Sequence, residues 1–239
     1  MEIKGFVDIS LVDWDEKVSS TIFLANCNMR CPFCYNVALV LHPEKLRTIQ
    51  FEEIVGYLER NREWIDGVVI TGGEPTIHGD LPNLCKKIRK LGFSVKMDTN
   101  GTNPTLIEEL INANLVDYIA MDIKTSLEQD KYYAAIGVKT PNLLNKILET
   151  ISILQDSQID HEFRTTVVPT IHGEKDIEEI CQKIKNCKKY VLQNYKSDVE
   201  TIDPNFRNSK PFSKEELKTF LRTARKIIPN TTLRDCTLK

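Results

Sequence analysis

The sequence has no long apolar segment and no excess of charge of either sign. No window approaches about 18 uninterrupted apolar residues, so we expect no membrane span. The opening MEIKGFVDIS lacks the basic start and apolar stretch of a secretion signal. A formal net charge of -2 argues against a dominant nucleic-acid surface. We therefore expect a cytoplasmic protein that binds neither membranes nor nucleic acid.

The chain also lacks low-complexity tracts, Gly/Ser linkers and strong internal repeats. Its 239 residues fit one large domain or two small ones, and α/β barrels often reach this length as one domain. We expect a single domain over residues 1–239. The seven cysteines are an odd number, and three of them are bunched. This usage does not fit a secreted disulfide framework and points to metal or redox chemistry in a reducing compartment.

What the sequence does contain is a repeated alternation of β-rich runs with amphipathic helical patterns. The expected strands are 20–25, 67–73, 93–101, 116–124, 161–169, 189–195 and 231–235. The expected helices are 51–65, 80–92, 103–114, 141–155, 174–185 and 213–227. This order predicts parallel strands with helical crossovers. The fold class is therefore α/β, an incomplete (open) parallel β/α barrel of about six units, short of the eight units of a closed barrel.

Two stretches between these elements, 125–140 and 196–212, are the longest without a clear pattern. Long irregular connections in compact domains are often functional, so we expect functional loops there.

Three cysteines, Cys27, Cys31 and Cys34, follow the first expected strand in the segment CNMRCPFC. Thiolates are soft ligands that select zinc or iron–sulfur clusters. Zinc would need a fourth ligand, for which His42 is the nearest histidine. A four-iron cluster on three cysteines leaves one iron open for a substrate or cofactor, which fits the count best. Thiols without any metal are the remaining alternative.

The next strand ends in a second polar segment, TGGEP at residues 71–75. Gly72 and Gly73 permit close backbone approach, and Glu74 can accept a hydrogen bond from an ammonium group. A lone GGEP string could be only a turn. Its position after the cysteine triplet favours a binding loop instead.

Taken together, the C-x3-C-x2-C loop with Phe33 before its last cysteine and the GGEP loop resemble the radical S-adenosylmethionine enzymes. The resemblance extends from about residue 3 to residue 235 and is closer to one branch, the activating enzymes of glycyl-radical proteins. The segments that carry it are the opening KGFVDISLVDWDEKVSSTIFLANCNMRCPFC and the later KMDTNG, VDYIAMDIK and EFRTTVVP. Within that branch, the chain particularly resembles the anaerobic ribonucleoside-triphosphate reductase activases and the related pyruvate formate-lyase activase. The branch often has the tripeptide CHN at this point, whereas this sequence has CYN, with Tyr35 in place of the histidine.

The resemblance implies one [4Fe-4S] cluster on Cys27, Cys31 and Cys34, with S-adenosylmethionine on the open iron. The residues it assigns to that cofactor are Phe33 (adenine), Gly72, Gly73 and Glu74 (methionyl amine), Asp98, Thr99 and Asn100 (beside the carboxylate, with a monovalent cation), Lys124 (carboxylate charge) and Arg164 (cofactor or substrate). His172 is a further candidate for the cavity. No catalytic side chain is implied beyond the cluster and the cofactor.

Structural interpretations compete for several of these residues. Asp98 could cap the turn TNG, and Arg164 could form an ion pair with Glu162. Asp122 and Lys124 point to the same side of their expected strand, where charges are costly unless paired or facing a cavity.

The resemblance also implies the chemistry: reduction by a one-electron donor such as flavodoxin or ferredoxin, a 5′-deoxyadenosyl radical, and hydrogen abstraction from a glycine of a partner glycyl-radical enzyme under anaerobic conditions. One alternative is a radical enzyme that acts on a small molecule, such as a deazapurine precursor, or on another protein. A second is a non-enzymatic iron–sulfur or zinc-binding protein.

Overall fold

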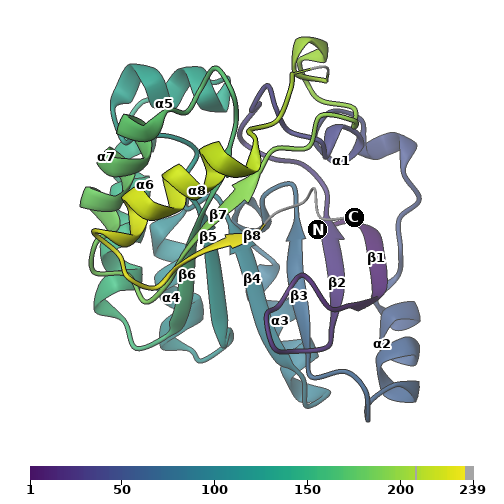
Figure 1. The fold of residues 1–239 in the computed structure, drawn as a ribbon. Helices are drawn as coiled ribbons and strands as arrows, with labels where there is room; N and C mark the ends of the chain where they lie inside the picture. Colours follow the sequence, from purple (N-terminus) through teal and green to yellow (C-terminus); the bar gives the residue numbers. More distant parts are fainter. Residues whose placement is uncertain (208, 235–239) are drawn as a thin grey trace. The chain divides into compact units, whose positions relative to one another are not determined.

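Strands and helices alternate along the chain, as the apolar pattern predicts (Figure 1). The structure is a computed structural model that describes residues 1–207 and 209–234. Asp235, at the end of the last expected strand, and Cys236 lie outside the described residues. The strands are β1 (Ile3–Ser10), β2 (Ser19–Leu24), β3 (Gly67–Gly72), β4 (Ser94–Thr99), β5 (Tyr118–Asp122), β6 (Asp160–Val167), β7 (Tyr190–Asn194) and β8 (Thr231–Arg234).

The helices follow the strands in turn. They are α1 (Val37–Leu41), α2 (Phe51–Arg60), α3 (Leu81–Lys90), α4 (Pro104–Asn112), α5 (Gln129–Ile136), α6 (Leu143–Asp156), α7 (Glu174–Ile184) and α8 (Lys214–Arg225). Three short 3-10 helices, η1 (Pro43–Lys45), η2 (Pro75–Ile77) and η3 (Pro204–Phe206), stand in the connections. Among the described residues, no helix has both the length and the apolar character needed to cross a bilayer.

The sheet follows the order of the sequence, from β1 at one end to β8 at the other. β2 pairs with β3, β3 with β4, β6 with β7 and β7 with β8, all in parallel. Each of the six strands from β2 to β7 is followed by one or more helices before the next strand. The predicted class, an α/β fold of about six parallel β/α units, is therefore confirmed.

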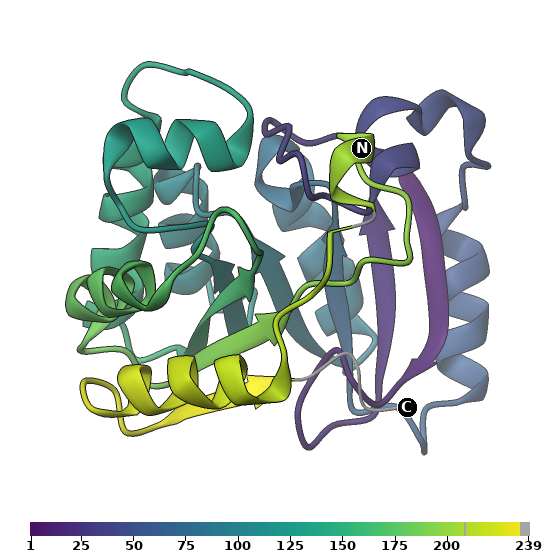
Figure 2. The same ribbon diagram turned by 45° about the horizontal axis from the view of Figure 1, so that its top comes forward.

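The described chain divides into two compact units. The first contains Met1–Asn28, Asn36–Thr99 and Asn103–Ala120, and the second contains Met29–Tyr35, Asn100–Thr102 and the chain from Met121 on. In the first unit, β2 and β3 are buried along almost their whole length, because parallel strands are covered on both faces. In the second unit, α8 packs beside α7 and β8 (Figure 2).

Side chains cap the starts of α8 and α4. The hydroxyl of Ser213 accepts a hydrogen bond from the Glu216 amide, and the side chain of Asn103 accepts one from the Leu106 amide. Gly92, directly after the C-cap of α3, has a positive φ of 88°, which glycine adopts readily. Asp80 stands at the N-cap of α3, but its carboxylate accepts from the Asn83 side chain instead of capping the helix.

Several elements differ from the predictions made from sequence. β1 was not predicted, and it pairs antiparallel with β2 with irregular register at two places, which obscures an alternating pattern. The stretch 125–140 is not wholly irregular, because it contains α5. β5 ends at Asp122, so Lys124 lies beyond the strand and not inside it.

Candidate functional site

In the first unit, the two glycines of the GGEP segment pack against the residues that lead into the cysteine loop. A Cβ on Gly73 would lie 1.7 Å from the Asn26 carbonyl oxygen, and one on Gly72 would lie 2.4 Å from the Leu24 backbone. The Gly73 amide donates to Leu24 O at 3.0 Å, and the Glu74 amide donates to Asn26 O at 2.8 Å. The close approach that the glycines permit is thus made by the protein's own backbone.

Glu74 is buried and held by short hydrogen bonds from neutral donors. Its Oε1 accepts from the Thr76 amide at 3.0 Å, the Thr76 hydroxyl at 2.6 Å and the Thr99 hydroxyl at 2.7 Å. The whole residue is only 1% exposed. Three donors on one oxygen fix the orientation of the carboxylate in the first unit, with Thr99 supplied by the end of β4.

Asp98 pairs with a lysine that the sequence did not single out. The Lys96 ammonium lies 3.3 Å from Asp98 Oδ1, and Lys96 is 2% exposed. The two residues are two positions apart, so their side chains lie on the same face of β4. Lys96 also donates to the Asp13 carbonyl. A cap of the turn TNG by Asp98 stays a prediction. In the second unit, Asn100 Oδ1 accepts from the amide and hydroxyl of Thr102 at 3.1 and 2.7 Å.

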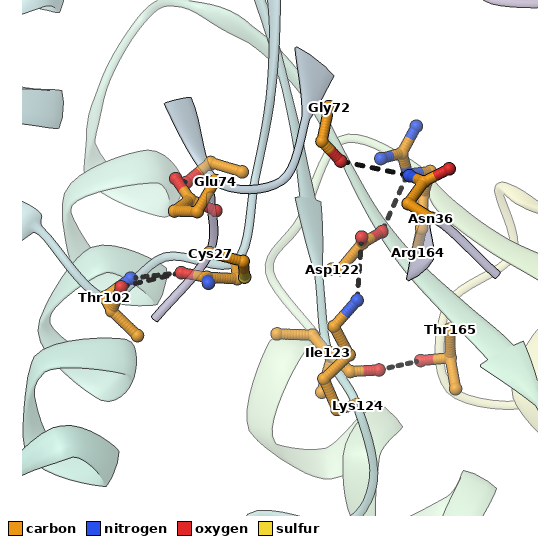
Figure 3. A network of polar contacts seen from close by, with 12 residues as sticks. Cys27, Asn36, Gly72, Glu74, Thr102, Asp122, Ile123, Lys124, Arg164 and Thr165 are labelled. Atoms are coloured by element: carbon orange, nitrogen blue, oxygen red, sulfur yellow. Dashed lines mark hydrogen bonds and ion pairs between the residues drawn. The ribbon is translucent and has the colours of Figure 1, made fainter. Parts of the chain in front are cut away.

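In the second unit, three charged side chains form one cluster, shown in Figure 3. The Asp122 carboxylate accepts from Arg164 Nε at 2.9 Å through Oδ1 and from Lys124 Nζ at 3.0 Å through Oδ2. Arg164 therefore pairs with Asp122. Glu162, its competing partner, instead lies 3.5 Å from both Lys189 Nζ and Arg234 Nη1. The cluster carries two positive charges and one negative charge.

The ionisation of this cluster follows from its geometry. Burial would raise the pKa of Asp122, but the charges and hydrogen bonds of Arg164 and Lys124 outweigh it and lower that pKa to about 2. Burial lowers the pKa of Lys124, yet the Asp122 carboxylate, and next a charge on Cys31, raise it above its usual value. Both side chains are therefore charged at neutral pH, and the cluster keeps a net charge of about +1.

The backbone of Lys124 is held on both sides. Its amide donates to the Tyr132 hydroxyl at 3.3 Å, and its carbonyl oxygen lies 3.0 Å from His172 Nε2. Because His172 Nδ1 accepts from the Val168 amide at 3.0 Å, the ring proton resides on Nε2. Burial lowers the pKa of His172 to about 4, so the ring is neutral. His172 is 6% exposed and braces the segment after β5.

The cysteine loop is divided between the two units: Cys27 belongs to the first, and Cys31 and Cys34 belong to the second. All three are thiols outside any disulfide. Within residues 1–207 and 209–234, no set of three or more His, Cys, Asp or Glu side chains is arranged to hold a metal ion. The three-cysteine ligand set therefore stays a prediction.

Two aromatic residues flank Cys34. Phe33 is buried, and its ring centroid lies 6.5 Å from that of Phe206 in a tilted arrangement. Tyr35 is 55% exposed, with the Lys196 ammonium 5.8 Å from its ring centroid. The predicted contact of Phe33 with an adenine stays a prediction.

The other described cysteines behave as ordinary buried thiols. Cys85 and Cys181 lie on the inner faces of α3 and α7 and are fully buried. Burial raises the pKa of each of these thiols, and of Cys187, to about 12. Such thiols are poor ligands and nucleophiles at neutral pH, which agrees with their omission from the predicted site.

Some residues that shape these clusters were not predicted from sequence. Thr76 and Lys96 give only weak local signals, namely a hydroxyl two residues after a glutamate and a period-two spacing with Asp98. Tyr132 gives none, because it lies in a helix eight residues beyond the lysine that it contacts.

Comparison with known proteins agrees with the resemblance. The sequence matches the Radical SAM superfamily over residues 21–184. A Methanocaldococcus jannaschii protein named "putative glycyl-radical enzyme activating enzyme" is 35% identical over 233 residues, which cover 97% of this chain and 95% of that protein.

Solved structures share the fold at low identity. Streptococcus suis SuiB bound to the precursor peptide SuiA superposes with a TM-score of 0.68 at 17% identity, over 91% of this chain and 49% of that one. A domain of a pyruvate-formate lyase-activating enzyme from Bacteroides vulgatus gives a TM-score of 0.54 at 16% identity, over 70% of this chain and 98% of that domain. At such identities the likeness is one of fold alone.

Proposed function

Because the chain belongs to the Radical SAM superfamily, we propose that it is an activating enzyme that abstracts hydrogen from a glycine of a partner glycyl-radical enzyme. One observation carries this proposal. The similarity to the Methanocaldococcus jannaschii protein runs through 97% of the chain, so it includes the regions outside the cysteine loop and the GGEP segment.

The proposal assigns a [4Fe-4S] cluster to Cys27, Cys31 and Cys34. Three thiols within eight residues, none in a disulfide, are a suitable donor set for iron and sulfide. The cluster and S-adenosylmethionine, when bound, would supply a 5′-deoxyadenosyl radical. The protein residues bind and orient the cofactor and exclude water.

Within the first unit, Glu74 would accept a hydrogen bond from the ammonium group of the cofactor. Its burial and the three donors on Oε1 support this role, since a side chain so held keeps a fixed direction. The main chain at Gly72 and Gly73 would position Glu74. Asp98 and Thr99 would lie beside the cofactor and a monovalent cation.

Within the second unit, Lys124 and Arg164 would supply positive charge to the cofactor carboxylate. The net charge of about +1 on their cluster with Asp122 supports this assignment, because an anion is attracted without either cation losing its partner. Phe33 would contact the adenine, and Asn100 would lie beside the cofactor carboxylate. A one-electron donor such as flavodoxin or ferredoxin would reduce the site from outside.

Anaerobic reconstitution with iron and sulfide, followed by reduction with S-adenosylmethionine and the glycyl-radical enzyme of the same organism, tests the proposal. We expect 5′-deoxyadenosine and a glycyl-radical signal in electron paramagnetic resonance spectra of the partner. Cys34→Ala should abolish both, while Cys187→Ala, which removes another half-buried thiol, should retain them.

The other outcomes separate the alternatives. Formation of 5′-deoxyadenosine without a glycyl radical would favour a radical enzyme that acts on a small molecule or a different protein. A cluster without any 5′-deoxyadenosine would favour a non-enzymatic iron–sulfur protein. Binding of zinc in place of iron and sulfide would exclude radical chemistry.

A further inference from the structure

The part of the cysteine loop in the second unit, Met29–Tyr35, is held on one side by the end of α5. The Arg30 amide donates to the Ile136 carbonyl at 2.8 Å. The next residue, Gly137, ends α5 in the left-handed region with a φ of 68°. A Cβ there would lie 2.1 Å from the Arg30 carbonyl oxygen. Only glycine allows α5 to end this close to the loop.

The other side of the same loop is held by the connection between β7 and α8. The Ile202 amide donates to the Cys34 carbonyl at 3.1 Å, and the Asp203 amide donates to the Pro32 carbonyl at 2.9 Å. These are main-chain bonds, so they fix the path of the loop and not only its side chains.

The connection that makes these bonds is itself braced. The Asp203 carboxylate accepts from the Asn205 amide at 3.0 Å and so begins η3, seen in yellow-green in Figure 2. The Thr201 hydroxyl donates to the Asp203 carbonyl at 2.8 Å, and Tyr195 donates through its hydroxyl to the Phe206 carbonyl. Neither α5 nor η3 was predicted from sequence, yet both lie in the two stretches expected to be functional.

We propose that residues 136–137 and 202–203 form a main-chain clamp that positions Cys31 and Cys34 for a ligand before any ligand binds. Cys31 lies between the clamped residues Arg30 and Pro32, and Cys34 is itself clamped. The Cys34 amide also donates to the Cys31 carbonyl at 3.0 Å. A preorganised pair of thiols binds a cluster without the entropic cost of ordering the loop. The clamp rests on the proposed function only in taking the ligand to be an iron–sulfur cluster.

Alkylation of the apoprotein with iodoacetamide, followed residue by residue with mass spectrometry, tests the α5 side. Cys31 is 7% exposed and should react slowly in the wild type. In Gly137→Ala, the new methyl group displaces Arg30, and we expect Cys31 to react about tenfold faster, the effect of one lost buried hydrogen bond. Cys85 and Cys181, both fully buried, report general unfolding and should keep their rates.

Two further glycine variants sharpen this test. Gly137→Asn tolerates the left-handed backbone but still carries the clashing Cβ, so it should expose Cys31 as Gly137→Ala does. Gly79→Ala is the matched control, because a Cβ there meets no heavy atom within 4 Å. Recovery of the wild-type rate in Gly137→Asn would show that backbone strain alone caused the effect and would overturn the clamp.

The second side is tested by a pair of substitutions at one position, which also serves if the Gly137 variants do not fold. Ile202→Pro removes the amide that bonds to Cys34 O, whereas Ile202→Ala keeps it. We expect faster alkylation of Cys34 in Ile202→Pro only. Equal rates in the two variants, or equal acceleration at Cys181, would overturn the clamp.

The loaded protein supplies a readout independent of activity. After reconstitution, Gly137→Ala and Ile202→Pro should lose iron to a chelator faster than Gly79→Ala and Ile202→Ala, with an altered electron paramagnetic resonance signal of the reduced cluster. Iron loss and spectra unchanged from the wild type would contradict the proposal. These measurements need no partner protein, so failure of the activase assignment leaves them interpretable.

Discussion

Two carboxylates near the ends of strands, Glu74 after β3 and Asp122 at the end of β5, are held in opposite ways. The donors on Glu74 Oε1 are one amide and two hydroxyls, all neutral. The donors on Asp122 are a guanidinium and an ammonium. Both sets of bonds are short, but they differ in the charge that remains around the carboxylate.

This difference teaches what each carboxylate is suited to do. The amide and hydroxyl donors on Oε1 orient the Glu74 side chain and bring no positive charge with them. The two cations beside Asp122 neutralise its negative charge, and one net positive charge remains on the cluster. We therefore expect Asp122 to matter most for stability and Glu74 to matter most for ligand binding.

The largest expected effect is on stability in Asp122→Asn. Loss of the carboxylate leaves Arg164 and Lys124 close together without their shared anion, which should lower the free energy of unfolding by about 3 kcal/mol. Urea unfolding of the apoprotein measures it. Asp156→Asn, at an exposed position of α6, is the matched control and should change stability little. A cost as small as that of the control would remove the distinction between the two carboxylates.

The next effect is on binding in Glu74→Gln. The glutamine retains an acceptor for Thr76 and Thr99 but lacks the charge, so S-adenosylmethionine should bind about thirtyfold more weakly, or about 2 kcal/mol. Equilibrium dialysis with the reconstituted protein measures the affinity, and urea unfolding should show little change. Glu108→Gln, on the exposed face of α4, controls for the loss of one negative charge. Unchanged affinity would argue against the ammonium role.

A smaller effect should follow from Thr99→Val. The substitution keeps the shape and removes one of the three donors on Glu74, which should destabilise the first unit by about 1.5 kcal/mol. Thr105→Val, at an exposed position in the first turn of α4, provides the comparison for a β-branched swap. If both variants unfold at the same urea concentration, the hydroxyl of Thr99 does not orient Glu74.

The smallest effect concerns pH. The pKa of Asp122 is lowered from 3.8 to about 2 in the folded protein, so the stabilisation is present above pH 4 and is lost as the pH falls toward 2. From this group alone, the free energy of unfolding should decrease by about 1 kcal/mol between pH 6 and pH 3. Denaturant unfolding at several pH values measures the slope. Asp122→Asn should have a shallower slope than the wild type, and equal slopes would contradict the assignment.

Much of the architecture could be predicted because apolar spacing and capping residues are local signals. The ends of α7, α8 and β7 lie within two residues of their predicted bounds. β1 and α5 were missed for physical reasons: β1 is an irregular antiparallel edge strand, and α5 is a short helix of weak amphipathic character.

The site could be predicted only as far as residue types and spacing reach. The thiols of the cysteine loop, the GGEP glycines and the charges of Asp122, Lys124 and Arg164 were all identified as candidates from the chain. Their partners were not. From sequence, Glu162 is the acidic residue expected to pair with Arg164, because it lies two positions away on the same strand. The observed pairing of Arg164 with Asp122 depends on the register between β5 and β6.

The sequence by itself determined the order of β/α units and the identity of the chemically active groups, because both depend on residues close together in the chain. Tertiary structure alone decided which groups share a hydrogen bond across long sequence distances. Lys124 meets His172 and Asp122 meets Arg164, 48 and 42 residues apart. Ile202 meets Cys34 through the main chain, which bears no side-chain signature. Such contacts form only when packing within the second unit brings distant segments together, since no local preference encodes them.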